Sequence, residues 1–160
     1  MLRISKLTDY GIVLLAHFAD HPGETWNARE LAESTGLPFP AVGKVLKALA
    51  QEGLLVSHRG ARGGYALARP AGEISVAEII EALEGPIALM ECSAGPGHCE
   101  KEATCRVRDP WQLIQGAIRS TLSGVSLRGL VRPGSEPLVH ITTLPAAGGT
   151  RPGDRGSNHV

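Results

Sequence analysis

Three cysteines are the residues of this sequence whose type and spacing most directly suggest chemistry. Cys92, Cys99 and Cys105 form a C-x6-C-x5-C arrangement, and the chain has no other cysteine. Three thiolates in one loop can converge on a soft metal ion or an iron–sulfur cluster. A structural zinc site usually pairs its ligands across a gap of about two to four residues, which this loop lacks. The spacing therefore favours a cluster over zinc, and zinc over three unliganded thiols.

The neighbours of these cysteines give little support for catalysis. A nucleophilic cysteine needs a nearby base and a group that orients it. His98 and Glu91 are close in sequence, but no known catalytic signature surrounds them, and no Walker or Rossmann glycine pattern occurs. An odd number of cysteines also argues against a disulfide framework. We therefore expect a protein that is not an enzyme and has no small-molecule substrate.

Charges are balanced in number but separated along the chain. The 160 residues include 16 Lys and Arg and 16 Asp and Glu, so the formal net charge is zero. Residues 43–69 carry five basic side chains and one acid, whereas residues 71–105 carry seven acids and one base. Binding of nucleic acid requires local rather than overall positive charge. The basic block is a candidate nucleic-acid surface, with two solvated faces as the alternative.

Three helices are predicted in the first third of the chain, over 5–20, 28–35 and 40–52, because apolar residues recur at three- and four-residue steps. Asn27 starts a capping box for the second helix, and Gly36 suits the residue after its end. Two short helices joined by a glycine-containing turn, the second with a basic face, indicate a helix-turn-helix. An ordinary three-helix bundle is the alternative.

A β-hairpin is expected directly after these helices, with strands over 54–59 and 65–68 and a glycine-rich turn over 60–64. This order is that of a winged helix-turn-helix, in which arginines at the hairpin tip contact phosphates or enter the minor groove. The candidate DNA-binding residues on the recognition helix and wing are Phe39, Lys44, Lys47, Arg59, Arg62 and Tyr65.

Two further helices flank the cysteine loop. The first covers 75–84, and the second starts at Asp109, the expected N-cap, with Pro110 at the first helical position. Apolar residues line one side of the second helix, which has little of its own chain to bury against. We therefore expect this helix to pack against a second copy in a homodimer, the alternative being that it folds back on the winged domain.

The fold class expected is mainly α with a small β-hairpin, a winged helix-turn-helix plus a long dimerisation helix. Glycine and proline are frequent in the last 29 residues, which we expect to be a disordered tail. No apolar stretch reaches the ~20 residues of a membrane helix, and no signal peptide is evident, so we expect a cytoplasmic protein. The predicted division is 1–70, winged helix-turn-helix; 71–108, connecting helix and cysteine loop; 109–131, dimerisation helix; and 132–160, tail.

Several segments together resemble the winged-helix iron–sulfur transcription regulators of the IscR and NsrR type. They are the start from Leu2 to Leu15, the wing from Arg59 to Arg69, the helix from Glu78 to Gly85, and the three-cysteine loop that follows it. The resemblance covers about residues 1–131. Within the family, the sequences of these motifs are most similar to those of the regulators of the SUF iron–sulfur assembly system.

The resemblance implies a homodimeric repressor or activator that binds an iron–sulfur cluster, 2Fe–2S by preference, through Cys92, Cys99 and Cys105. Relatives of the IscR type take a histidine three residues past the last cysteine as fourth ligand, but this chain has Arg108 there. Relatives of the NsrR type take an aspartate from the first helix of the other subunit, and Asp9 matches it. His98 is the second candidate, and the alternative role for Asp9 is a first-turn acid favoured by the helix dipole.

Three other functions remain open on these residues, one of them a metal-free regulator that responds through oxidation of the same thiols. A nitric-oxide-sensing repressor would use the same ligands, since it too exploits the reactivity of a cluster. A zinc-stabilised DNA-binding protein would use the same cysteines without sensing anything. The sequence does not separate them.

Overall fold

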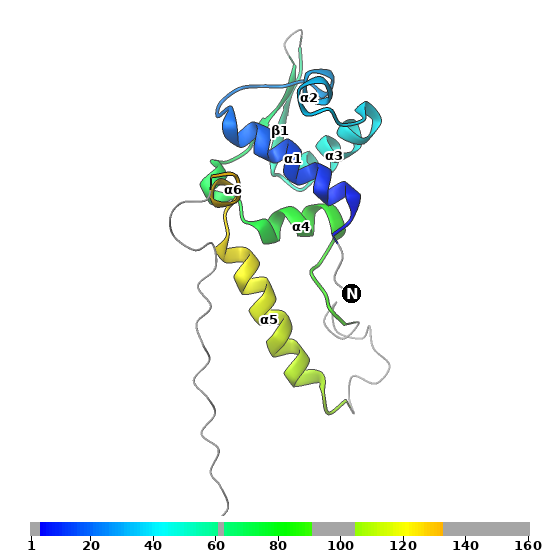
Figure 1. The fold of residues 1–160 in the computed structure, drawn as a ribbon, viewed down its shortest axis with the longest axis vertical. Coiled ribbons are helices and arrows are strands. Elements are labelled where there is room, and N and C mark those ends of the chain that lie inside the picture. Colours follow the sequence, from blue (N-terminus) through cyan, green and yellow to red (C-terminus); the bar gives the residue numbers. More distant parts are fainter. Residues whose placement is uncertain (1–3, 61–62, 91–104, 133–160) are drawn as a thin grey trace, which may run out of the picture.

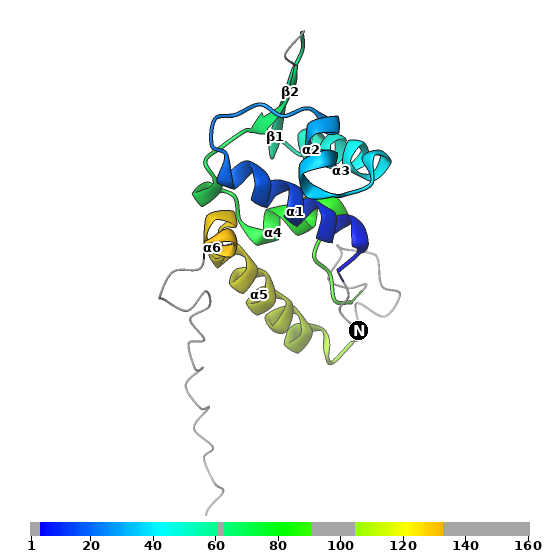
Figure 2. The same ribbon diagram turned by 45° about the horizontal axis from the view of Figure 1, so that its top comes forward.

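The computed structural model describes residues 4–60, 63–90 and 105–132, and its elements form a winged domain from which one helix extends (Figure 1). A view turned by 45° shows the hairpin projecting from the end of the domain opposite that helix (Figure 2). In chain order the elements are α1 (Lys6–Asp20), α2 (Ala28–Thr35), α3 (Phe39–Gln51), β1 (Leu55–His58), β2 (Gly64–Leu67), the 3-10 helix η1 (Ala71–Glu73), α4 (Val76–Glu84), α5 (Arg108–Gly124) and α6 (Leu127–Val131).

Local side-chain hydrogen bonds explain where the helices begin. Asn27 caps α2, and the Glu30 carboxylate accepts from the Asn27 N–H at 2.9 Å, which completes a capping box. Ser75 and Glu78 form the same arrangement at the start of α4. Gly36 ends α2 in the left-handed region with φ 69°, a conformation that glycine adopts without steric cost. These expected boundaries are confirmed, as is the fold class of a mainly helical chain with a small hairpin.

One hydrophobic core joins the winged domain. Apolar side chains of α1, α2, α3, β1, α4 and α6 are fully or almost fully buried in it, among them Leu14, Phe18, Leu31, Leu46, Leu55, Ile79 and Leu127. The helices α1 and α4 cross closely at Gly11, where any Cβ would collide with the side chain of Leu83. Ala71, Ile74 and Ile79, which follow the hairpin, are buried in the same core.

The chain breaks after α5 and returns to the winged domain, so the segment 109–131 contains two helices, α5 and α6. Val125 is extended, its carbonyl accepts from the Val76 N–H at 2.9 Å, and the Leu127 N–H donates to the Ile74 carbonyl at 2.7 Å. Ser126 then caps α6, whose Leu127 is fully buried. The free energy gained by burying Leu127 and by forming a new N-cap exceeds what the chain would gain by continuing one helix past Gly124.

The start of α5 also differs from the expectation. The helix begins at Arg108, so Asp109 is its second residue rather than its N-cap, and Pro110 is its third. Val107 stands at the N-cap without a side-chain hydrogen bond. Proline is tolerated there because the first-turn N–H groups have no partner within the helix.

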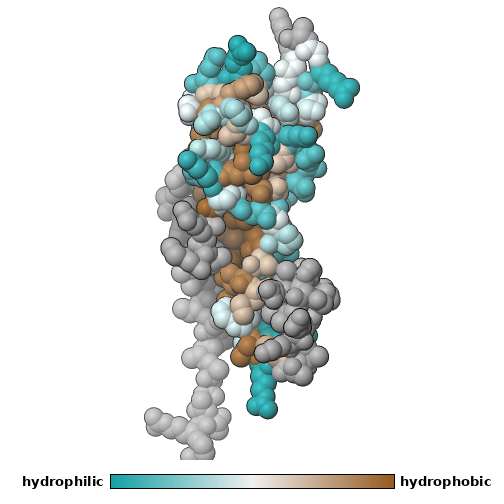
Figure 3. Space-filling model, turned by 90° about the vertical axis from the view of Figure 1, so that its right-hand side faces the viewer, coloured by the Kyte–Doolittle hydropathy of each residue, from teal (hydrophilic) through white to brown (hydrophobic). Residues whose placement is uncertain are grey.

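Polar contacts attach α5 to the end of α4 and the segment after it. The Arg119 guanidinium donates to both carboxylate oxygens of Glu81, at 2.9 and 3.3 Å. The Gln115 side chain donates to the Ile87 carbonyl and accepts from the Leu89 N–H at 2.9 Å. Much of α5 remains in contact with solvent, and apolar surface continues below the winged domain in the space-filling view (Figure 3). None of the helices described is long and apolar enough to cross a membrane.

Candidate nucleic-acid interface and cysteine segment

The helix α3 divides into a buried and a solvent-facing side. Val42, Val45, Leu46 and Leu49 are its buried residues. Lys44 and Lys47 are exposed, as the helical spacing predicted. With α2 packed against it, α3 has the position of the second helix of a helix-turn-helix. Its free face is therefore basic and accessible.

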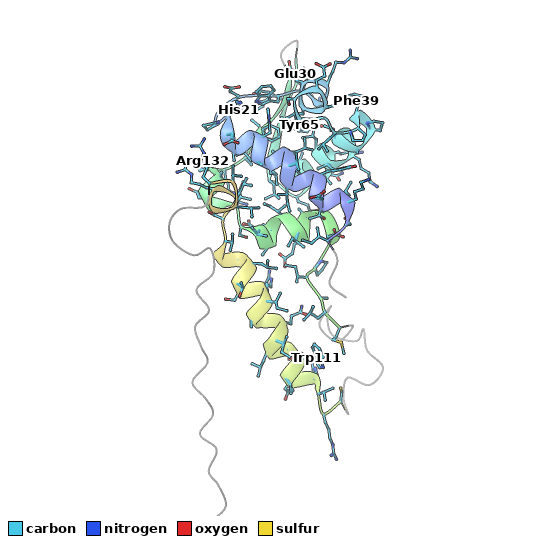
Figure 4. All side chains as sticks on the ribbon, viewed as in Figure 1. His21, Glu30, Phe39, Tyr65, Trp111 and Arg132 are labelled. Carbon is cyan, nitrogen blue, oxygen red and sulfur yellow. The ribbon has the colours of Figure 1, made fainter. Side chains whose placement is uncertain are left out.

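Phe39 is the first residue of α3, and its side chain is 54% exposed. It projects from the edge of the winged domain, away from the core (Figure 4). Gly43 follows one turn later, and a Cβ built there has nothing within 4 Å. The amino-terminal half of the helix thus presents an aromatic ring beside an open backbone surface.

The hairpin has the geometry expected of a wing. Residues of β1 and β2 pair antiparallel from Leu55 with Leu67 to His58 with Gly64. Arg59 is exposed directly after β1. Gly60 has φ 121°, and its carbonyl accepts from the Gly63 N–H at 2.9 Å, which turns the chain back. The basic side chain of Arg59 is therefore carried next to a glycine turn; Arg62 lies outside the described residues.

Tyr65 differs from the other candidate DNA contacts, because its half-buried side chain packs against the core. Its backbone pairs with Trp26, so the segment before α2 forms a β-bridge with β2. A Cβ on the neighbouring Gly64 would approach the Trp26 carbonyl oxygen to 2.5 Å. The structure thus gives Tyr65 a part in positioning the wing, while contact with DNA stays a prediction.

Two histidines and a tryptophan form a cluster that sequence reasoning missed. The ring centroids of His17 and His21 are 4.5 Å apart, and the Trp26 ring stands edge-on to both, at 4.5 and 5.2 Å. The His21 Nδ1–H donates to the His17 carbonyl at 2.8 Å. The signal was available, since residues four apart on a helix lie on one face.

Burial affects the titration of this cluster. Within the part of the chain that the structure describes, the buried His17 Nε2 has no hydrogen-bond partner. Desolvation, with the neighbouring His21, lowers the pKa of His17, against a smaller opposing effect of Asp20 and Glu24. The neutral imidazole is therefore the form that this packing favours.

Asp9, the candidate fourth ligand, lies on the exposed side of the first turn of α1. Its carboxylate makes no ion pair with any residue in the described ranges. Ile4, Lys6 and Ile12 line an open hollow beside it. A carboxylate in this position is free to contact a group from outside the subunit.

The helix turn that carries Asp9 is hydrogen-bonded to the end of α4. Glu84, the last residue of α4, accepts from the Ser5 N–H at 2.9 Å and from the hydroxyl of Thr8, a fully buried residue. Hydrogen bonding by the Ser5 side chain, together with the Thr8 hydroxyl and the Ser5 N–H, lowers the pKa of Glu84. The start of α1 is therefore fixed to α4, and Asp9 with it.

Of the cysteine segment the structure describes only the end. Cys105 is a half-buried free thiol shortly before α5, and Arg108 is the first residue of that helix. Cys92, Cys99 and His98 lie outside the described residues. Among those that are described, no three His, Cys, Asp or Glu side chains are grouped to hold a metal ion. The convergence of the three thiols stays a prediction.

Comparison with known proteins agrees with this architecture. Residues 4–133 match the family model Rrf2, described as an iron-dependent transcriptional regulator. The chain is 29% identical over 135 residues to the protein Rrf2 of Nitratidesulfovibrio vulgaris. The matched residues cover 84% of this chain and 90% of that protein.

Two solved structures extend the likeness to the fold. One is CymR, the global cysteine regulator of B. subtilis, at 29% identity and a TM-score of 0.63, covering 82% of this chain and 97% of CymR. The other is IscR of T. potens, at 27% identity and a TM-score of 0.60, covering 81% of this chain and 86% of IscR. These matches confirm the resemblance to winged-helix regulators of the IscR type. The chain belongs to the Rrf2 family of helix-turn-helix transcriptional regulators.

Proposed function

We propose that this regulator binds operator DNA as a homodimer, holds an iron–sulfur cluster, 2Fe–2S by preference, through Cys92, Cys99 and Cys105, and controls genes of the SUF assembly system. The observation that carries the proposal is the concentration of all three cysteines between α4 and α5 of a chain whose family model is described as iron-dependent. Such a protein acts in the cytoplasm, where thiols stay reduced and available to iron.

The DNA-binding surface is built from α3 and the wing. Lys44 and Lys47 face solvent on α3, and Arg59 is exposed at the end of β1. Cations in these positions release counterions from DNA when they neutralise phosphates, which is the sequence-independent part of affinity. Lys44 and Lys47 contact the major groove or its edges, and Arg59 with Arg62 contacts the adjacent backbone or minor groove.

The donor set fits an iron–sulfur cluster. Cys105 is a free, half-buried thiol, and thiolates are the usual ligands of such clusters. Asp9 supplies a carboxylate that has no ion partner among the described residues, on a helix turn that Glu84 fixes in place. When bound, the cluster supplies a redox- and nitric-oxide-reactive centre. The chain contributes the ligands and, through Asp9 of the partner subunit, a connection between the two winged domains.

Dimerisation through α5 follows from its surface. Leu113 is 76% exposed and Ile114 is 45% exposed, and no described segment of the same chain covers them. Adjacent exposed aliphatic side chains on a helix favour association, because burial removes them from water. A second α5 offers the matching surface, since a two-fold interface brings the same residues together.

Spectroscopy of the protein purified without oxygen tests the cluster. We expect visible absorption and a Mössbauer signal with stoichiometric iron and sulfide, both lost in a Cys105→Ser variant. Asp9→Ala changes the Mössbauer parameters if Asp9 is a ligand, whereas Glu33→Ala, an exposed carboxylate on α2, leaves them unchanged. Colourless protein with stoichiometric zinc contradicts the cluster. An unchanged spectrum in Asp9→Ala removes that residue from the ligand set.

Likeness to CymR of Staphylococcus aureus, whose structure is solved in an oxidized form, supports a second candidate, a regulator whose thiols act without a metal. Under this alternative, substitution of the cysteines by serine alters the DNA response of a metal-free protein. Nitric oxide sensing uses the same residues as the main proposal. Mapping the bound promoters separates the two, since assembly genes and nitric oxide detoxification genes are different targets.

A further inference from the structure

The amino-terminal end of α3 is apolar, which is unusual for a surface that faces DNA. Pro38, Phe39 and Pro40 are consecutive and all exposed. Pro38 is the N-cap of the helix and forms no side-chain cap hydrogen bond. Of these residues Phe39 presents the largest apolar surface, with 54% of its side chain exposed.

This end of the helix has few hydrogen-bond donors to offer a phosphate. Pro38 and Pro40 have no backbone N–H. The N–H groups of Ala41 and Val42 already donate to the Pro38 carbonyl, at 2.9 and 3.1 Å. The Phe39 N–H is the one donor left in this first turn, so the usual anion site of a helix start is largely absent here. An apolar contact is the chemistry that remains.

Neighbouring residues place Phe39 on the face that meets the major groove. Phe39, Gly43 and Lys47 follow at steps of four residues and therefore form one line along the helix. Gly43 leaves open space between the other two, with nothing within 4 Å of its Cβ position. The Lys47 side chain is exposed farther along the same line. This geometry allows the helix to approach base edges closely at Gly43 while Phe39 reaches past it.

We propose that Phe39 determines operator specificity by packing against thymine methyl groups in the major groove. The inference rests on the proposed role of α3 as the recognition helix. The C5 methyl of thymine is the apolar group that the natural bases present in this groove, and it accepts contacts from Phe. Specificity at these positions comes from burial of methyl groups rather than from hydrogen bonds.

Replacement of thymine by deoxyuridine tests the proposal directly, because it removes the methyl group and keeps base pairing. Full-length dimer selects a preferred duplex from a random library, and each thymine of that duplex is then exchanged singly. We expect at least one position in each half-site where the exchange weakens binding about fourfold. This is the effect of removing one buried methyl group from the contact. A second comparison places cytosine or 5-methylcytosine at that position. The duplex with 5-methylcytosine should bind more tightly, because it restores the methyl group.

Variants then assign the effect to Phe39. Phe39→Ala removes the contact in both half-sites, so it loses about the square of that factor, roughly sixteenfold, on the thymine duplex. It also no longer distinguishes deoxyuridine from thymine, whereas Phe39→Leu keeps the distinction. Lys47→Ala serves as the matched control: it weakens binding to both duplexes and leaves their ratio unchanged. Circular dichroism confirms that the exposed site tolerates the changes.

Two results overturn the inference in different ways. If Phe39→Ala discriminates between the two bases as the parent does, or the parent shows no sensitivity at any thymine, Phe39 does not read methyl groups, and the role of α3 stands. If the parent dimer selects no duplex at all, the proposed function itself fails.

Discussion

Trp26 and Tyr65 exchange two backbone hydrogen bonds, the Trp26 N–H with the Tyr65 carbonyl at 2.9 Å and the Tyr65 N–H with the Trp26 carbonyl at 2.8 Å. Trp26 immediately precedes the N-cap of α2, and Tyr65 lies in the return strand of the wing. The pairing therefore fixes the wing relative to the helix-turn-helix. The candidate DNA-binding side chains on the two parts, such as Lys47 and Arg59, are held at a defined separation for this reason.

Gly64→Ala should disturb that pairing. The new Cβ would lie 2.5 Å from the Trp26 carbonyl oxygen, so the backbone must shift, and overpacking of this kind costs about 1–3 kcal/mol. The denaturation midpoint measures the loss. Gly43→Ala is the matched control, because nothing lies within 4 Å of its Cβ and alanine favours a helix by about 1 kcal/mol. Equal effects of the two substitutions would show that the close approach is unimportant.

Arg59→Ala should weaken operator binding and reduce its salt dependence. A lost phosphate contact lowers the slope of log affinity against log salt by about one unit. Fluorescence anisotropy at several salt concentrations gives the slope. Arg128→Ala, an exposed arginine on α6, is expected to leave it unchanged. A parental slope in Arg59→Ala would rule out the phosphate contact.

Stability should decrease as the pH falls below about 6.5, the ordinary pKa of histidine. The pKa of His17 is lowered in the folded chain, so the unfolded chain binds the proton first and gains stability relative to the folded one. The loss proceeds from pH 6.5 down to the folded pKa. His17→Phe, which keeps an aromatic ring beside Trp26 without a titrating group, should flatten this dependence.

The control for this measurement is His58→Gln. His58 is exposed on the wing, and its substitution should leave the pH dependence of unfolding as in the parent. Thermal melts from pH 8 to pH 5 compare the three proteins. If His17→Phe retains the parental pH profile, the decrease belongs to other groups.

Leu113→Glu should dissociate the proposed dimer. A carboxylate on each copy would be buried against apolar surface, which is unfavourable without a partner charge. Sedimentation velocity measures the oligomeric state, and Gln112→Glu, at an exposed neighbouring position, tests whether added charge alone has this effect. A Leu113→Glu protein that remains dimeric at micromolar concentration would place the interface elsewhere.

Features set by residues close in sequence were predictable. The capping boxes at Asn27 and Ser75 and the left-handed Gly36 depend on hydrogen bonds or conformations within three residues, so the sequence pattern contains them. The exposure of Lys44 and Lys47 follows from helical periodicity in the same way. The position and solvent-facing side of α3 could therefore be predicted without coordinates.

Features set by distant backbone pairing were not predictable. The bridges between Trp26 and Tyr65 and between Ser75 and Ser126 use main-chain groups, which every residue has. For this reason nothing in the sequence indicated that β2 has a neighbour beyond β1. The break before α6 was missed for the same reason, since it depends on main-chain hydrogen bonds from Val76 to Val125 and from Leu127 to Ile74, which are distant in sequence.

The return of the chain at Val125 makes the cysteine segment and α5 an insertion within the winged domain rather than an appendage to it. The insertion leaves the domain at Gly85, just after α4, and rejoins it beside Val76, where α4 begins. The two ends of α4 are thus the two points at which this insertion joins the winged domain. Because α5 packs on α4, and α4 packs on α1 and α3, any change in the position of α5 is transmitted first to α4 and then to the helices that carry Asp9 and the basic face.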